Sequence, residues 1–152
     1  MGVKRYDRIL IKLNDLFVMN HQLEETFAKV QDNVEDRNLQ SFVKQKIIER
    51  NQFGESLENE LKKLETKTNN SLVLARRNGL KKFNFKRLLN FNDDIDLLKQ
   101  VYKMMQLSVK KYNELLMEMH LPLSLCKLLI KQRDRIQNSL EVMQRETAIA
   151  IT

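Results

Sequence analysis

The chain has 152 residues, of which 42% are hydrophobic and 31% charged, and its formal net charge is +7. Three Gly and one Pro are too few for the turns of a many-stranded sandwich or barrel. A single Cys excludes a disulfide framework and Cys-based zinc motifs. The longest apolar runs are shorter than the roughly 20 residues that cross a bilayer, and the chain does not open on the apolar stretch of a signal peptide. We therefore expect one soluble, cytoplasmic, mostly helical domain.

The positive charge is concentrated in residues 67–92, which carry seven Lys or Arg and no acidic residue. Residues 1–66 have eleven basic and twelve acidic residues, and residues 93–152 have nine and eight. Interleaved charges of this kind are typical of solvated helix faces. The middle stretch is a different kind of segment.

Two long helical patterns precede the basic stretch. Over residues 6–34, apolar residues recur at steps of three and four once Asn20 fills a gap, which predicts a helix with one apolar stripe. A second helix is predicted over 38–65, with Asp36 or Asn38 as its cap. Gly54 lies inside it, where Gly costs about 1 kcal/mol relative to Ala, so we expect a close contact there. The two stripes are Ile9, Leu13, Leu16, Leu23, Phe27, Val30 and Val34, then Leu39, Phe42, Val43, Ile47, Phe53, Leu57, Leu61 and Leu64.

Two further helices are predicted after the basic stretch, over 93–119 and 123–147. Asn92, Asp93 and Asp94 provide a cap and negative charge at the start of the first, and Pro122 suits the start of the second. The third stripe is Ile95, Leu98, Tyr102, Met105, Val109, Tyr112, Leu116 and Met119, and the fourth is Cys126, Leu129, Ile136, Leu140 and Met143. We expect Tyr102 and Tyr112 to be core residues and Cys126 to be a buried, unreactive thiol.

The connections between these helices predict their arrangement. Helices joined by a few residues fold back as antiparallel hairpins. The connection over 67–92 is long enough to return the chain along a full helix length, so the second and third helices run parallel. The fold class predicted is an all-α four-helix bundle whose long crossover contains a short helix, from about Ser71 to Asn78.

Short motifs occur at specific places on these helices. They are Glu24-Glu25-Thr26-Phe27-Ala28, Arg50-Asn51-Gln52-Phe53-Gly54-Glu55-Ser56-Leu57, Lys110-Lys111-Tyr112-Asn113-Glu114-Leu115-Leu116, Leu121-Pro122-Leu123 and Gln132. With two hairpins and a long crossover, they resemble the ferritin-like superfamily, and more closely a bacterial ferritin-like family of unassigned function. The resemblance spans residues 7–145 and implies a ferritin-like bundle.

A ferritin-like di-iron centre needs a Glu from each of two helices and a Glu-x-x-His from each of the other two. Neither His has a Glu three residues before it, because Val18 and Met117 occupy those positions. The resemblance implies that Tyr102, Met105 and Leu140 occupy inward places where the family tends to keep its ligands, and apolar side chains cannot hold a hard dication. We therefore expect no metal or other cofactor. Four weak metal-ligand candidates remain, Glu24, Glu25, Glu49 and Gln52, and a small polar network that includes Asn20, Glu24, Glu49 and Gln52 is the simpler interpretation.

The basic crossover is a candidate binding surface for nucleic acid, an anionic membrane or an acidic protein. Its candidate binding residues are Arg76, Arg77, Lys81, Lys82, Lys86 and Arg87. We favour the simpler interpretation that its apolar residues pack on the bundle while the cations stay in water. That interpretation predicts that Phe83 and Phe91 are substantially buried.

No catalytic constellation is found in the sequence: it has no Gly-rich phosphate loop and no supported Ser-His-Asp set. Our first hypothesis is a non-enzymatic ferritin-like bundle that acts through protein interaction as a homodimer, with the role in stress physiology suspected of similar proteins. One alternative is a metal-binding or oxidoreductase protein with a non-standard carboxylate site. Another is binding of nucleic acid or an anionic membrane through the crossover.

Overall fold

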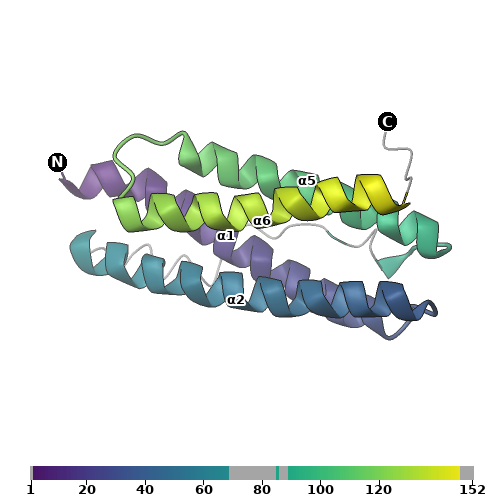
Figure 1. The fold of residues 1–152 in the computed structure, drawn as a ribbon. Helices are drawn as coiled ribbons and strands as arrows, with labels where there is room; N and C mark the ends of the chain where they lie inside the picture. Colours follow the sequence, from purple (N-terminus) through teal and green to yellow (C-terminus); the bar gives the residue numbers. More distant parts are fainter. Residues whose placement is uncertain (1, 69–84, 86–88, 148–152) are drawn as a thin grey trace.

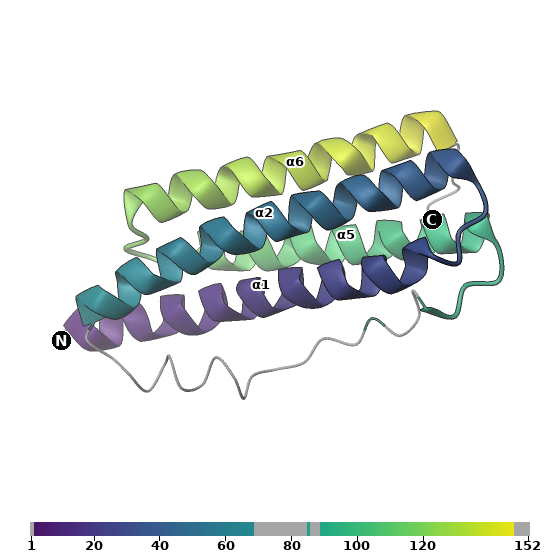
Figure 2. The same ribbon diagram turned by 90° about the horizontal axis from the view of Figure 1, so that it is seen from below.

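The computed structural model describes residues 2–68, 85 and 89–147, and this part of the chain forms four α-helices and no strand. The helices are α1 (Gly2–Gln31), α2 (Arg37–Thr68), α5 (Asp94–Leu116) and α6 (Leu123–Thr147). α1 packs mainly on α2 and α5 mainly on α6, while smaller contacts join α1 to α5 and α2 to α6. The prediction of four helices packed in pairs is therefore confirmed. Figures 1 and 2 show that α2 and α5 run in the same direction, as the long connection between them predicts.

The helices begin and end close to the predicted residues. α1 is shifted toward the N-terminus, and α5 ends at Leu116 rather than at residue 119. Asp93 caps α5, where its side chain accepts a hydrogen bond of 2.7 Å from the Asp96 amide. Asp36 has the same role before α2, because its Oδ1 accepts from the Asn38 amide at 3.3 Å. Both carboxylates lie at the positive end of a helix dipole, which they stabilise.

The core is built from one stripe of each helix. All seven apolar positions predicted for α1 are buried, and Asn20, which fills the gap in that stripe, is 0% exposed. The predicted α2 stripe also faces inward, with Phe42 and Ile47 at its half-buried edge. Sequence periodicity therefore identified the inner faces of the first hairpin.

The predicted inner face of α5 is wrong at both ends. Ile95 is 62% exposed, and Met119 lies beyond the helix and is 74% exposed. The buried residues instead include a row displaced by about one position. The reason is Ser108, which is fully buried in that row. Because serine is polar, a prediction from the spacing of apolar residues does not include it. The row comprises Leu97, Val101, Met105, Ser108, Tyr112 and Leu115.

Two smaller predictions also fail. Cys126 is half-buried, and its neighbour Leu125 takes the fully buried position near the start of α6. Gly54 makes no close contact, because a Cβ atom built on it would meet no neighbouring atom within 4 Å. The glycine in α2 is therefore not required by packing.

Part of the crossover prediction can be followed in the structure. Phe91 is half-buried and packs against the core, and Phe85 is 5% exposed. Both agree with a connection held to the bundle by apolar side chains. Phe83 lies outside the described residues. None of the described helices has an apolar stretch long enough to cross a membrane.

Candidate functional site

A fully buried arginine lies in the middle of the bundle. Arg50 is 1% exposed and lies on the inner face of α2, three residues after Ile47 and three before Phe53. Its Nη1 donates to Asn20 Oδ1 at 2.8 Å, and its Nη2 donates to Ser108 Oγ at 3.2 Å. The guanidinium is thus held by neutral oxygens from α1 and α5. Among the described residues no carboxylate forms an ion pair with this guanidinium, although Glu49 opposes the lowering of its pKa. A fully buried cation without an ion pair is rare in protein interiors.

The hydrogen bonds continue from Arg50 through all four helices. Asn20 Nδ2 donates to the Leu16 carbonyl at 2.9 Å and to the Tyr112 hydroxyl at 3.2 Å. The Tyr112 hydroxyl donates to Gln132 Oε1 at 2.6 Å, and Gln132 Nε2 donates to the Phe53 carbonyl at 3.3 Å. Asn20, Ser108, Tyr112 and Gln132 are each buried. We call Asn20, Arg50, Ser108, Tyr112 and Gln132 the polar centre.

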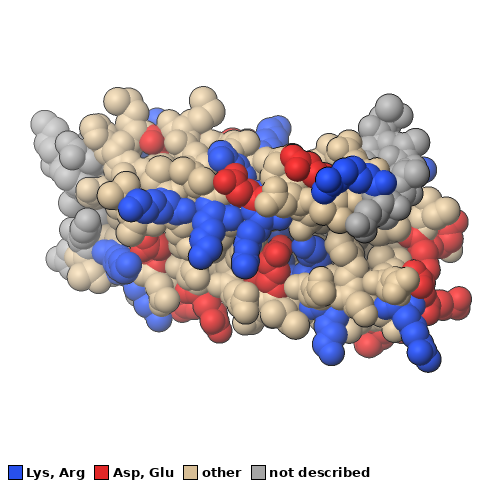
Figure 3. Space-filling view, viewed as in Figure 1, with Lys and Arg blue, Asp and Glu red and all other residues tan. Residues whose placement is uncertain are grey.

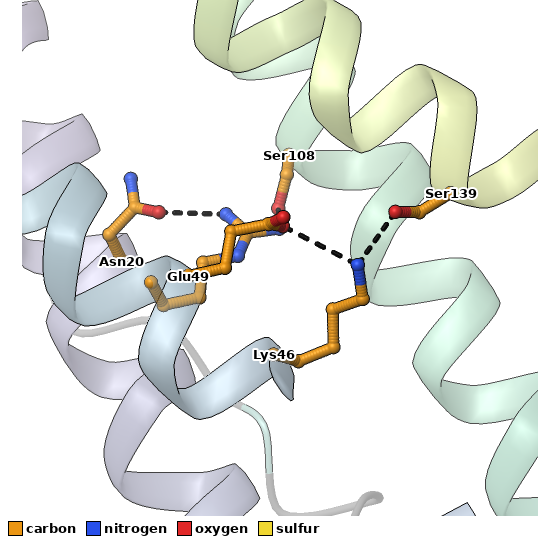
Figure 4. Close-up of polar contacts among 6 residues, drawn as sticks. Asn20, Lys46, Glu49, Ser108 and Ser139 are labelled. Carbon is orange, nitrogen blue, oxygen red and sulfur yellow. Dashed lines mark hydrogen bonds and ion pairs between the residues drawn. The ribbon is translucent and has the colours of Figure 1, made fainter. Parts of the chain in front are cut away.

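A second buried cation lies one turn before Arg50 on α2. Lys46 is 6% exposed, and its Nζ donates to Ser139 Oγ of α6 at 2.6 Å. Its carboxylate partner is Glu49, at 3.5 Å. In Figure 4, dashed lines join Lys46 to both Glu49 and Ser139. Two buried cations therefore share the neighbourhood of one half-buried carboxylate.

Burial shifts the protonation equilibria of this region. Desolvation is the main cause that lowers the pKa of Lys46, and Glu49 opposes that shift while Arg50 adds to it. Burial also lowers the pKa of Arg50, whose guanidinium still remains charged at neutral pH. Desolvation raises the pKa of Tyr112 to about 12, with Arg50 and the hydrogen bond from Asn20 acting in the opposite direction. The centre of the bundle is therefore cationic, with a neutral tyrosine beside the guanidinium.

The polar centre does not fit a di-iron site. Hard dications take carboxylate and imidazole ligands, whereas the polar centre consists of Arg50 with one phenol, two carboxamides and a hydroxyl. A metal ion placed there would also face the repulsion of the fixed guanidinium charge in a poorly screening interior. Within residues 2–68, 85 and 89–147, no group of three or more His, Cys, Asp or Glu could hold a metal ion.

The four metal-ligand candidates have separate partners or positions. Glu24 accepts a hydrogen bond from Asn51 at 3.1 Å, and Glu25 pairs with His21 at 2.7 Å on the exposed side of α1. Glu49 pairs with Lys46. Gln52 is exposed on α2. The predicted polar network is therefore right in Asn20 and wrong in Gln52, which lies on the surface.

Sequence reasoning missed the two buried cations and Ser108. A signal for Arg50 was present, because it stands at the one step of the second stripe, between Ile47 and Phe53, where no apolar residue lies. Asn20 was identified from the same kind of gap in the first stripe. Arg50 was missed although Asn20 was found, because an arginine on a helix is ordinarily expected to face solvent.

The six candidate binding residues of the crossover, from Arg76 to Arg87, lie outside the described residues. The polar centre is thus the best-defined cluster of charged and polar side chains in the described part. Comparisons of the chain with protein-family models, curated proteins and solved structures found no match.

Proposed function

We propose that this chain is a ferritin-like four-helix bundle without metal or enzymatic chemistry, and that it acts by binding other proteins. The observation that supports this best is the polar centre, where a guanidinium and four neutral side chains fill the middle of the bundle. The antiparallel hairpins and the common direction of α2 and α5 are compatible with the ferritin-like fold (Figure 2). The family resemblance also suggests a homodimer and a role in stress physiology.

The surface carries the features expected of a binding protein. Apolar side chains are exposed on all four described helices and on the turn between α5 and α6. The most exposed are Ile48, Ile95, Met117, Met119 and Leu123, at 50%, 62%, 84%, 74% and 70%. Apolar side chains on a helix face anchor that face when it packs in the groove of another protein.

Elemental analysis tests the metal part of the proposal. The purified protein is incubated with Fe²⁺, Mn²⁺ or Zn²⁺, freed of unbound metal by gel filtration, and analysed beside a Glu24→Ala/Glu49→Ala variant. We expect metal far below one ion per chain in both proteins. Stoichiometric metal in the wild type that is lost in the variant would overturn the proposal and favour the carboxylate-site alternative. Analytical ultracentrifugation of the same samples measures whether the chain dimerises.

A further inference from the structure

A row of basic side chains follows the outer face of α6. Lys127, Lys131 and Arg135 are exposed and stand four residues apart, so that each lies about 6 Å further along the helix than the one before. Figure 3, viewed as in Figure 1, shows Lys and Arg gathered along α6 where it lies above α2. We call these three residues the α6 basic row.

In the described part of the chain, none of the members of the α6 basic row has an ion pair or hydrogen bond. Arg133, on the same helix, is by contrast held by Asp134 at 3.2 Å and by Asn113 at 3.0 Å. Like charges four residues apart on a helix repel one another. An anionic partner seated on the row would relieve this repulsion.

Two exposed aliphatic side chains lie beside the row. Leu123 and Ile130 are 70% and 39% exposed, and their spacing of seven residues places them on nearly the same side of α6, two turns apart. Apolar residues at this spacing, with charged residues beside them, are the pattern that a second helix packs against. The outer face of α6 therefore combines apolar anchors with charge.

We propose that the outer face of α6 binds an acidic amphipathic helix of a partner protein. Leu123 and Ile130 pack against the apolar residues of that helix, and Lys127, Lys131 and Arg135 pair with its carboxylates. The inference rests on the proposed function and specifies the chemistry of the partner.

Two other anionic partners fit this face less well. Nucleic-acid strands are bound with the help of stacking aromatic side chains, but the large hydrophobic residues exposed in the described part are all aliphatic. Asp134 and Glu141 lie on the same exposed face, where a phosphate backbone or an anionic lipid surface, negative throughout, would meet them. A protein helix can place a neutral or basic residue opposite each of these two carboxylates.

The test uses a fluorescein-labelled helical peptide of about 20 residues, long enough to span about 30 Å. The peptide carries Leu at heptad positions and Glu at the flanking positions, and a peptide of the same composition in scrambled order is the reference. Fluorescence anisotropy of the full chain should show preferential binding of the heptad peptide that weakens with salt. The triple variant Lys127→Glu/Lys131→Glu/Arg135→Glu should bind about tenfold or more weakly, and Ile130→Asn should also weaken binding.

The matched control is Lys44→Glu/Lys99→Glu/Lys103→Glu, which changes the net charge equally at exposed positions of α2 and α5. It should retain most of the affinity, and circular dichroism should show both triple variants to be as helical as the wild type. The inference is overturned if the two peptides bind equally, or if both triple variants lose affinity equally. It is also overturned if a single-stranded oligonucleotide or phosphatidylserine vesicles bind the α6 basic row more tightly than the peptide. These outcomes leave the metal analysis unaffected, so a failed partner assignment is distinguishable from a failed function.

Discussion

Replacing Asn20 by Leu removes the closest hydrogen-bond acceptor of the buried guanidinium. Asn20 Oδ1 accepts from Arg50 at 2.8 Å, and Asn20 Nδ2 also donates to the Tyr112 hydroxyl. Loss of a partner that leaves a buried charge uncompensated costs about 3–5 kcal/mol, and loss of the neutral bond costs about 1 kcal/mol more. The greater apolar burial of Leu returns about 1–2 kcal/mol. We therefore expect Asn20→Leu to lower the free energy of unfolding by about 3 kcal/mol.

Urea denaturation measures this change, and thermal unfolding should show a decrease of about 6–12 °C in Tm. Asn51→Leu is the matched control, because Asn51 is exposed and its partner Glu24 is only half-buried; we expect a change within about 0.5 kcal/mol. The variant Asn20→Leu/Arg50→Met, which removes the charge together with its acceptor, should recover much of the lost stability. A stability of Asn20→Leu within about 1 kcal/mol of the wild type would show that the guanidinium does not depend on this acceptor.

Three other substitutions test separate parts of the structure. Gly54→Ala should raise the free energy of unfolding by about 1 kcal/mol, since the added Cβ meets no atom within 4 Å; a destabilised variant in urea denaturation would contradict this. Leu140→Asp should lower it by more than about 3 kcal/mol, because Leu140 is 4% exposed, and a wild-type Tm would mean that α6 faces another way. The pKa of Tyr112 is raised to about 12 from an ordinary 10.0, so the folded protein favours the neutral phenol. This preference stabilises the fold in full below pH 10, and the stabilisation is lost by about pH 12. This loss amounts to about 2–3 kcal/mol and should be missing from the pH dependence of Tyr112→Phe, so parallel profiles for the two proteins would refute it.

The inner face of α1 was predictable from sequence because its apolar stripe is nearly pure. Every predicted apolar position of α1 is buried, and Asn20 marks the single polar step. α5 was harder, because Tyr102, Met105 and Tyr112 belong both to the predicted stripe and to the buried set. The choice between the two stripes depended on Ser108, whose burial is explained by its hydrogen bond to Arg50 on another helix.

The polar centre could be predicted only in part. A gap in an apolar stripe indicates an inward polar residue, and this was enough to place Asn20. The same gap could not assign Arg50 to the interior, because its acceptors come from positions 30 and 58 residues away along the chain. Burial of a charge depends on partners that a one-dimensional pattern does not bring together.

The hydrogen bonds of the polar centre also limit how the two hairpins can slide past each other. Arg50 on α2 reaches Ser108 on α5, and Tyr112 on α5 is bonded to Asn20 on α1. Leucines exchange places along a stripe at little cost, whereas a shift of one helical turn, about 5.4 Å, would leave the guanidinium facing hydrocarbon. The polar centre therefore fixes the register in which the two hairpins pack. An interior made only of leucine would not specify that register.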